Sequence, residues 1–279
     1  MESIFLTIRR FSFWKAVKCE FLLTMFYVLV GCASTIPGDS HYKQNVNELK
    51  VALAFGITSM TLMQCFLPIC GPPQMNPAIT IAMLCTRRVH VVTSFIHILA
   101  QCLGGLAGAG ILYGVTPARK HDNLGVTMVH NDIGRGQAFG IEFIITFIMT
   151  FAYFAGHDNP ALFGGFQSAP VGLSVMFGHT FGWQFTGASM NPARSLGPAI
   201  VCNEWSDHWV YWIGPVLGSI LGGITYEYTT GGGPEIKNLR RNSSLGTMMN
   251  TETVRGSKES VEMPTELTFT IPATPDPEI

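Results

Sequence analysis

Apolar residues along the chain gather in long runs that are separated by short polar stretches. Six of these runs are about 20 residues long, which is enough to cross a bilayer as a helix. They are 14–36, 49–68, 89–114, 136–156, 166–184 and 209–230. Two shorter apolar pieces, 76–86 and 191–201, are too short to cross and are expected to be re-entrant or interfacial. The pattern predicts an all-α membrane protein with six transmembrane helices and two half-length helices.

The two halves of the chain repeat each other. "EFLLT" (20–24) and "EFIIT" (142–146) share a pattern, and "QCLGGLAGAG" (101–110) resembles "PVLGSILGGI" (215–224). Each half contains three long runs, an odd number, so the halves must insert into the membrane with opposite topology. Inverted repeats of this kind place a functional site where the halves meet, near the bilayer midplane.

The tripeptide Asn-Pro-Ala opens each of the two short apolar pieces. The first copy is Asn76, Pro77 and Ala78, and the second is Asn191, Pro192 and Ala193. Asn is a favoured N-cap and Pro suits the first helical turn, so one copy alone is an ordinary helix start. Two copies entering from opposite sides would bring two helix N-termini together near the bilayer centre, where they must line a cavity or be buried in protein. Their dipoles and the Asn amides would bind a small polar molecule and repel a cation.

Composition supports a membrane protein and excludes several function classes. The chain has 279 residues, of which 13% are charged, against about 25% in soluble domains. A net charge of -1 argues against nucleic acid as a partner. The seven cysteines are scattered, so neither a disulfide framework nor a metal site is predicted. We find no nucleophile–base pair or phosphate loop, so we expect neither an enzyme nor a cofactor.

Several motifs resemble the aquaporin family, over about residues 14–230. Besides both Asn-Pro-Ala copies, they are "CTRR", "AQCLG", "GVTMVH", "TGASMNPARS" and "HWVYW", and they are most similar to the glial-type, water-selective vertebrate members. The resemblance implies the aquaporin fold, a passive water channel in the plasma membrane, water as permeant and a homotetramer. The established account of aquaporin selectivity, by pore diameter, hydrogen-bond donors and electrostatic barriers, is carried over with it.

The expected organisation has three parts. A cytoplasmic N-terminus (1–13) precedes the channel domain (14–230), whose repeats cover about 14–114 and 136–230, and a polar cytoplasmic tail (231–279) is expected to be disordered. The side that carries both termini holds most of the Lys and Arg residues, which places it in the cytoplasm.

The resemblance places a selectivity filter at Phe55, His179, Ala188 and Arg194. An arginine inside an apolar segment is costly and marks function; here it would donate hydrogen bonds and oppose cations. Taken singly, Phe55 is also typical of helix packing and His179 of a buried structural histidine. Together the bulky side chains leave little room for glycerol. Ser195 stands where glycerol-conducting relatives usually have Asp, which also favours water.

Two carboxylates, Glu20 and Glu142, lie within the membrane runs and should therefore face the protein interior. The resemblance implies that they support the Asn-Pro-Ala loops through hydrogen bonds, and Gln101 is expected to share that role. A proton relay is the alternative interpretation. In the tail, "RRNSSL" places two arginines before Ser243 and resembles a basophilic kinase site.

Small residues recur at four-residue spacing, at Gly104 with Gly108 and at Gly218 with Gly222. This spacing permits close approach of membrane helices, and packing within one subunit is enough to explain it.

The loop before the first Asn-Pro-Ala departs from the family. Relatives usually read Gly-His-x-Ser-Gly-x-His-x there, whereas this chain reads "LPICGPPQM", with Gln74 in place of a His. Pro72 and Pro73 stiffen the loop and remove two N–H donors. Our hypothesis is ordinary selectivity with altered conductance or cytoplasmic gating. Two other functions stay open: a channel for glycerol, urea or peroxide, and a weakly conducting junctional or structural protein.

Overall fold

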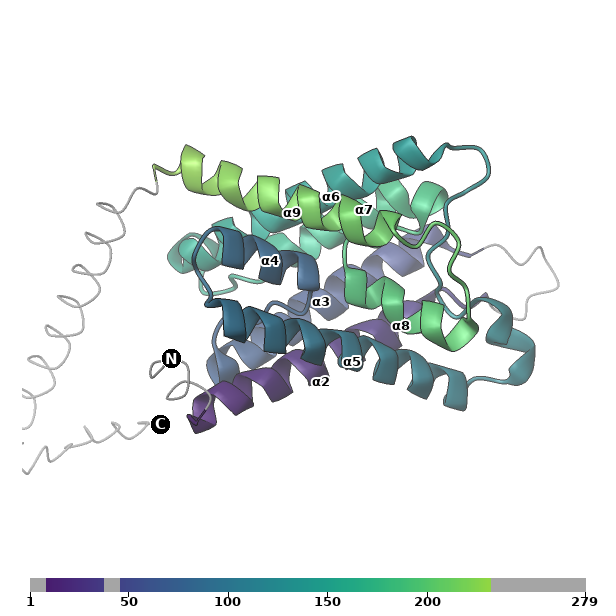
Figure 1. Cartoon of the computed structure of the whole chain (residues 1–279), viewed down its shortest axis with the longest axis horizontal. Helices are drawn as coiled ribbons and strands as arrows, with labels where there is room; N and C mark the ends of the chain where they lie inside the picture. The colour runs from purple at the N-terminus through teal and green to yellow at the C-terminus, as the bar shows by residue number, and fades with distance from the viewer. Residues whose placement is uncertain (1–8, 38–45, 232–279) are drawn as a thin grey trace, which may run out of the picture. The chain divides into compact units, whose positions relative to one another are not determined.

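The computed structural model describes residues 9–37 and 46–231, and these form a helical bundle (Figure 1). The long helices are α2 (Phe11–Ser34), α3 (Glu48–Cys70), α5 (Val91–Val115), α6 (Arg135–Asp158), α7 (Ala169–Thr186) and α9 (Val210–Thr229). The short ones are α4 (Pro77–Cys85) and α8 (Pro192–Cys202), with 3₁₀ turns at Ala118–Asn123 and Pro160–Phe163. The expected tail, with Ser243, lies outside the described residues.

The all-α fold is confirmed over the described residues, and every predicted span has its helix. Both short helices begin at the Pro of an Asn-Pro-Ala copy. Four helices, α2, α3, α5 and α6, are long and apolar enough to cross a membrane. The other two long helices, α7 and α9, contain polar residues among the apolar ones, such as His179 and Gln184 in α7.

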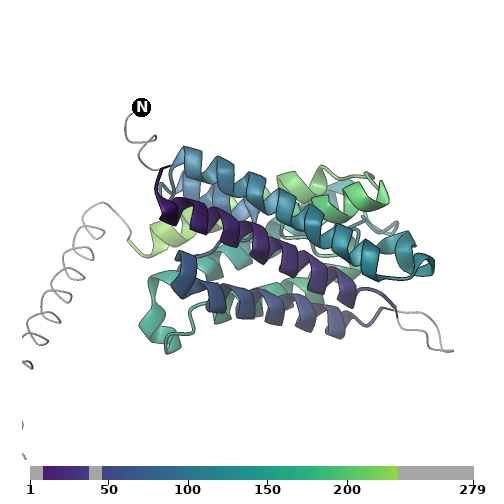
Figure 2. The same ribbon diagram turned by 90° about the horizontal axis from the view of Figure 1, so that it is seen from below.

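Contacts at the helix ends define two sides of the bundle. On the first side, Arg88 pairs with Asp158 at 2.6 Å and with Glu227 at 2.7 Å. On the second side, Arg135 pairs with Asp207 at 2.5 Å. The long helices run between these two sides, as Figures 1 and 2 show, so α2 begins on the first side and α3 begins on the second.

Each short helix packs on a long helix of the other repeat. In the first half of the chain, α4 lies along α9, where Gly223 faces Ala82 (Figure 1). In the second half, α8 lies along α5, and a side chain at Gly197 would collide with the Gly105 carbonyl. The two repeats are therefore interlocked through their half-length helices.

Glycines set the closest helix crossings, as their spacing predicts. On α5, a methyl group at Gly104 would strike the Phe21 carbonyl of α2, and one at Gly108 would strike the Met25 carbonyl. The matching residues of α9, Gly218 and Gly222, meet the carbonyls of Phe143 and Phe147 on α6 in the same way. The pairs α2–α5 and α6–α9 are thus equivalent crossings in the two repeats.

Arg88, just after α4, ties three elements together on the first side. Its guanidinium makes two parallel hydrogen bonds to Asp158, at 2.6 and 2.7 Å, and one to Glu227 at 2.7 Å. It also lies over the Phe154 ring, 4.3 Å from the centroid. Burial acts to lower the pKa of Arg88, but the two carboxylates raise it by more, so it lies above the usual range. Arg88 therefore stays charged and fixes the end of α4 against α6 and α9.

The α2–α5 crossing gives a matched test on one helix. Gly108→Ala should destabilise the fold because its methyl group meets the Met25 carbonyl, whereas Gly110→Ala points into open space. Overpacking of this kind costs about 1–3 kcal/mol. Thermal unfolding of the purified protein in detergent should show a lower melting temperature for Gly108→Ala and no loss for Gly110→Ala. Equal melting temperatures would contradict the close crossing.

Candidate functional site

The two half-length helices begin as their sequences predict. The Asn76 side-chain carbonyl accepts from the Ala78 N–H at 2.8 Å, and the Asn191 carbonyl accepts from the Ala193 N–H at 3.0 Å. Pro follows each Asn at the first helical position, where its missing N–H has no structural cost. Each Asn therefore caps its own helix.

The same two Asn residues also join the helices to each other. The Asn76 amide donates to the Met190 carbonyl at 2.8 Å, and the Asn191 amide donates to the Met75 carbonyl at 2.8 Å. The N-termini of α4 and α8 therefore face one another in the bundle interior. Both positive dipole ends point at the same place, which disfavours a cation there.

The residue before each Asn has a left-handed backbone. The φ angle is 60° at Met75 and 52° at Met190, a conformation that costs roughly 1–2 kcal/mol for an L-residue. A buried carboxylate holds each one. Glu20 accepts from the Gln74 and Met75 N–H groups at 2.8 and 2.7 Å, and Glu142 accepts from Ser189 and Met190 at 2.8 and 2.9 Å.

The two carboxylates differ in their third partner. Gln101 donates its amide to Glu20 at 2.8 Å and contacts Thr80 at 2.9 Å, so all three sequence-predicted loop residues lie at the loops. Thr186 donates its hydroxyl to Glu142 at 2.7 Å. Sequence reasoning missed both threonines, because nothing in a lone Thr within an apolar run indicates which polar side chain it will meet.

Three of the four expected filter residues are in contact. The rings of Phe55 and His179 stack with centroids 4.3 Å apart, and the Arg194 guanidinium carbon lies 4.8 Å from the Phe55 centroid. All three side chains are buried. Because the two rings are in contact, nothing fits between them, and the guanidinium lies over the Phe55 ring. Gly31 on α2 makes room for Phe55, since a side chain there would overlap the ring.

Arg194 is oriented by backbone, and part of its donor set stays open. Its NH1 group donates to the Gly125 carbonyl, and the Nδ1 of His179 contacts the Val175 carbonyl at 2.8 Å. Among the described residues, Arg194 Nε and NH2 and His179 Nε2 are buried without a hydrogen-bond partner. Buried polar groups almost always have a partner, so these three atoms stand out as hydrogen-bonding groups that the described residues leave open.

The fourth expected filter residue, Ala188, lies on the loop that leads into α8, the helix that carries Arg194. It is buried with a φ of 46°, and its N–H donates to the Thr186 hydroxyl at 3.1 Å. Its small side chain adds a wall without a polar group. Ser195 faces away from this role, because its hydroxyl bonds with those of Ser189 at 2.6 Å and Thr127 at 2.7 Å.

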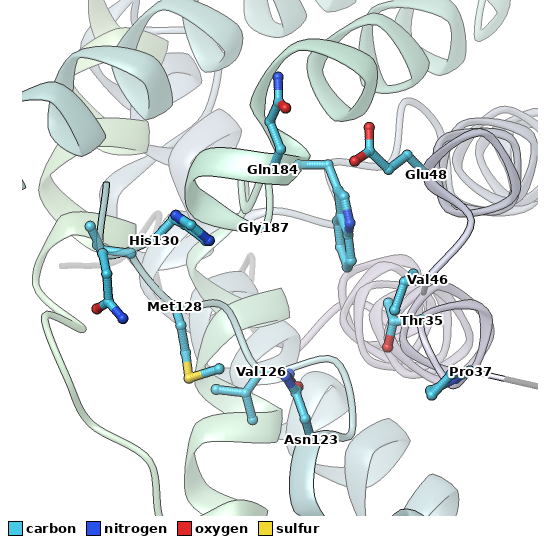
Figure 3. Close-up of a pocket in the computed structure, with 13 residues that line it drawn as sticks. Thr35, Pro37, Val46, Glu48, Asn123, Val126, Met128, His130, Gln184 and Gly187 are labelled. Carbon is cyan, nitrogen blue, oxygen red and sulfur yellow. Dashed lines mark hydrogen bonds between the residues drawn. The ribbon is translucent and has the colours of Figure 1, made fainter. Parts of the chain in front are cut away.

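A cavity of about 640 Å³ opens on the second side of the bundle next to these residues. Figure 3 shows His130 and Met128 across the opening from Glu48 and Thr35. Its wall includes Gly187, which precedes Ala188, and Val126, which follows the Gly125 that holds Arg194. Two residues of the cavity lining are therefore chain neighbours of Ala188 and of the Gly125 carbonyl that binds Arg194.

Toward the first side, two further polar atoms are buried without a partner among the described residues: Tyr153 Oη and His97 Nε2. His97 Nδ1 lies 3.3 Å from the Gln74 side-chain oxygen. Sequence reasoning missed both residues. A histidine and a tyrosine inside apolar runs were the available signal, since an ionisable residue within a membrane span is a functional candidate.

Removing the charge of Glu142 tests the loop support. In Glu142→Gln, an amide NH2 group replaces one carboxylate oxygen and faces a backbone N–H donor, so one hydrogen bond is lost. A hydrogen bond to a charged group contributes about 1.5–3 kcal/mol to stability. We expect a lower melting temperature and at least severalfold lower water permeability per protein in proteoliposomes, measured by stopped-flow light scattering.

The matched control is Glu204→Gln, whose carboxylate bonds locally to the Ser206 N–H at 2.8 Å on the second side. It should leave both quantities unchanged. A Glu142→Gln protein that melts and conducts like the unmodified chain would remove Glu142 from the loop-supporting role.

Comparisons with known proteins agree with this architecture. The family model described as major intrinsic protein matches residues 7–226. Aquaporin-4 of Mus musculus is 46% identical over 219 residues, 78% of this chain and 68% of that protein. The lens fiber major intrinsic protein of Lithobates pipiens is 38% identical over 262 residues, 93% of this chain and 97% of that protein.

A solved structure shares the fold. The aquaglyceroporin of Plasmodium falciparum superposes with a TM-score of 0.65 at 20% sequence identity, and the match covers 77% of this chain and 95% of that one. At that identity the likeness speaks for the fold alone. The family model and the curated relatives both extend over most of the chain, and the chain belongs to the major intrinsic protein family.

Proposed function

We propose that this chain is a passive, water-selective channel of the plasma membrane, driven by osmotic gradients. Its termini would lie in the cytoplasm, so the first side would be cytoplasmic and the second side extracellular. One observation carries the proposal: beside the Phe55 ring, Arg194 and His179 present buried polar atoms that have no hydrogen-bond partner among residues 9–37 and 46–231. That combination suits a small permeant which both donates and accepts hydrogen bonds.

The filter argues for water over glycerol. Phe55 and His179 form a closed ring stack with centroids 4.3 Å apart, and a charged guanidinium lies over the Phe55 ring. A three-carbon polyol needs a wider passage with an apolar wall for its backbone. Water needs only donors and acceptors, which Arg194 and His179 supply.

The facing half-helices argue against ion and proton passage. A side-chain amide has two N–H donors, and Asn76 and Asn191 each use one of them to bond the opposite loop. The second donor is left for a water oxygen at the centre. A water held there by two donors points its own hydrogens outward, and the positive helix ends oppose a cation or hydronium ion.

The proposal includes a homotetramer with one pore per subunit, which the family resemblance implies. The filter and loop contacts described above all lie within one chain. Each subunit would therefore carry a complete pore, and assembly would serve membrane packing instead of building the site.

The deciding experiment is osmotic swelling and shrinkage of liposomes that carry the purified chain. We expect water flux well above that of empty liposomes and glycerol flux at the background level. Glycerol flux equal to water flux would refute water selectivity, and absence of both from correctly assembled protein would favour a structural role.

Shortening Arg194 tests the filter. Arg194→Val removes the charge and the open donors, so we expect uptake of glycerol and a measurable proton leak while water flux persists. Solute uptake and internal pH are read in the same liposomes. Arg135→Val, at an exposed position on the second side, is the control and should behave like the unmodified chain. Unchanged selectivity in Arg194→Val would contradict the filter assignment.

The first-side loop is proposed to alter conductance or gating. Gln74 accepts from the Thr80 hydroxyl at 2.8 Å and lies 3.3 Å from His97, so its side chain belongs to the network around Glu20. Deleting Pro73 together with Gln74→His should change the permeability per pore or its pH response. Identical unit permeability and pH response would dispose of this idea.

A further inference from the structure

A groove on the outer surface of the bundle lies between α2 and α5, toward the first side. It has a volume of about 560 Å³. Trp14, Lys18 and Phe21 of α2 form one wall, and Ile96, Leu99 and Leu103 of α5 form the other. It is separate from the filter and the Asn-Pro-Ala loops, which lie in the interior.

The groove follows from the helix crossing. The backbones of α2 and α5 come closest where Gly104 and Gly108 meet the Phe21 and Met25 carbonyls, and the two helices cross there in Figure 1. Toward the first side, the glycines of α5 give way to Ala100, Leu99 and Ile96, which line the groove. This part of the α2–α5 boundary is therefore an apolar groove, or slot, with walls formed by side chains.

The charges around the slot have one sign. Lys18 is the charged residue of its lining and forms no ion pair within residues 9–37 and 46–231. Lys15 lies one turn earlier on α2, and Arg10 precedes the helix. The nearest acid on α2, Glu20, is buried with its oxygens bonded to the Gln74 and Met75 N–H groups. An anion at the end of the slot therefore meets basic side chains.

We propose that this groove binds an anionic phospholipid. One acyl chain would lie against Phe21, Leu99 and Leu103, and the phosphate would lie beside Lys18 at the start of α2. Trp14 suits this depth, since tryptophan concentrates at the membrane interface, and basic pockets between membrane helices on the cytoplasmic side take anionic headgroups. The site does not require that the pore conducts.

Lipid binding to the purified full-length chain tests the proposal. Native mass spectrometry would compare a phosphatidylserine with a phosphatidylcholine of the same acyl chains, and the lipid-induced rise in melting temperature would be a second readout. We expect phosphatidylserine to bind more tightly. Lys18→Gln should weaken it about fivefold, since a basic residue near an anionic surface contributes about 1 kcal/mol. Lys50→Gln, an exposed lysine at the start of α3, should have no effect.

A second pair of variants tests the slot itself. Leu103→Trp should fill it and displace the lipid, whereas Leu173→Trp on α7, where the native leucine has the same exposed fraction of 58%, should not. Melting without added lipid checks that all variants fold. The proposal would be overturned by equal binding of the two lipids or by an unchanged affinity of Lys18→Gln for phosphatidylserine. Loss of lipid binding in both Trp variants would overturn it as well. So would equal competition by soluble glycerophosphoserine, which has no acyl chains.

Discussion

Two buried carboxylates, Glu20 and Glu142, supply acceptors for backbone N–H groups that water cannot reach inside a bilayer. An unsatisfied N–H at that depth costs several kcal/mol, and the left-handed Met75 and Met190 add strain. Each carboxylate takes two of these donors at 2.7–2.9 Å, so the chain can leave a helix, turn and begin a new one at mid-membrane. The facing Asn residues and the orientation of Arg194 all depend on that turn being held.

The sequence was enough to predict the helices but not the partners of individual side chains. Span length and the Asn-Pro caps are local properties, so the six long and two short helices could be located from the pattern alone. The Gly125 carbonyl that orients Arg194, and the space at Gly31 that admits Phe55, depend on residues far apart in the chain. Their positions follow from tertiary packing, which no local pattern records. The family resemblance named Phe55, His179 and Arg194, but the direct ring stack became visible only in the structure.

The pseudo-symmetry of the two halves ends just outside the central Asn pair. On the first side, amide, imidazole and hydroxyl groups of Gln74, Gln101, His97 and Thr80 surround Glu20. On the second side, the hydroxyls of Thr186, Ser189 and Ser195 surround Glu142 and its loop. The two carboxylates are therefore surrounded by different polar groups: side-chain amides, an imidazole and a hydroxyl at Glu20, and hydroxyls alone at Glu142 and its loop.

The interlocking of the short helices bears on how the chain is made. Residues 77–85 form a helix too short to cross the membrane, and its main packing partner, α9, begins only at residue 210. The clamp at Arg88 needs Glu227 as well. During synthesis, α4 therefore stays incompletely packed until α9 has been made. α8 has no such delay, because its partner α5 is already in place. Among the described residues, α9 is the last helix, and a chain truncated before it would leave α4 without its main packing partner.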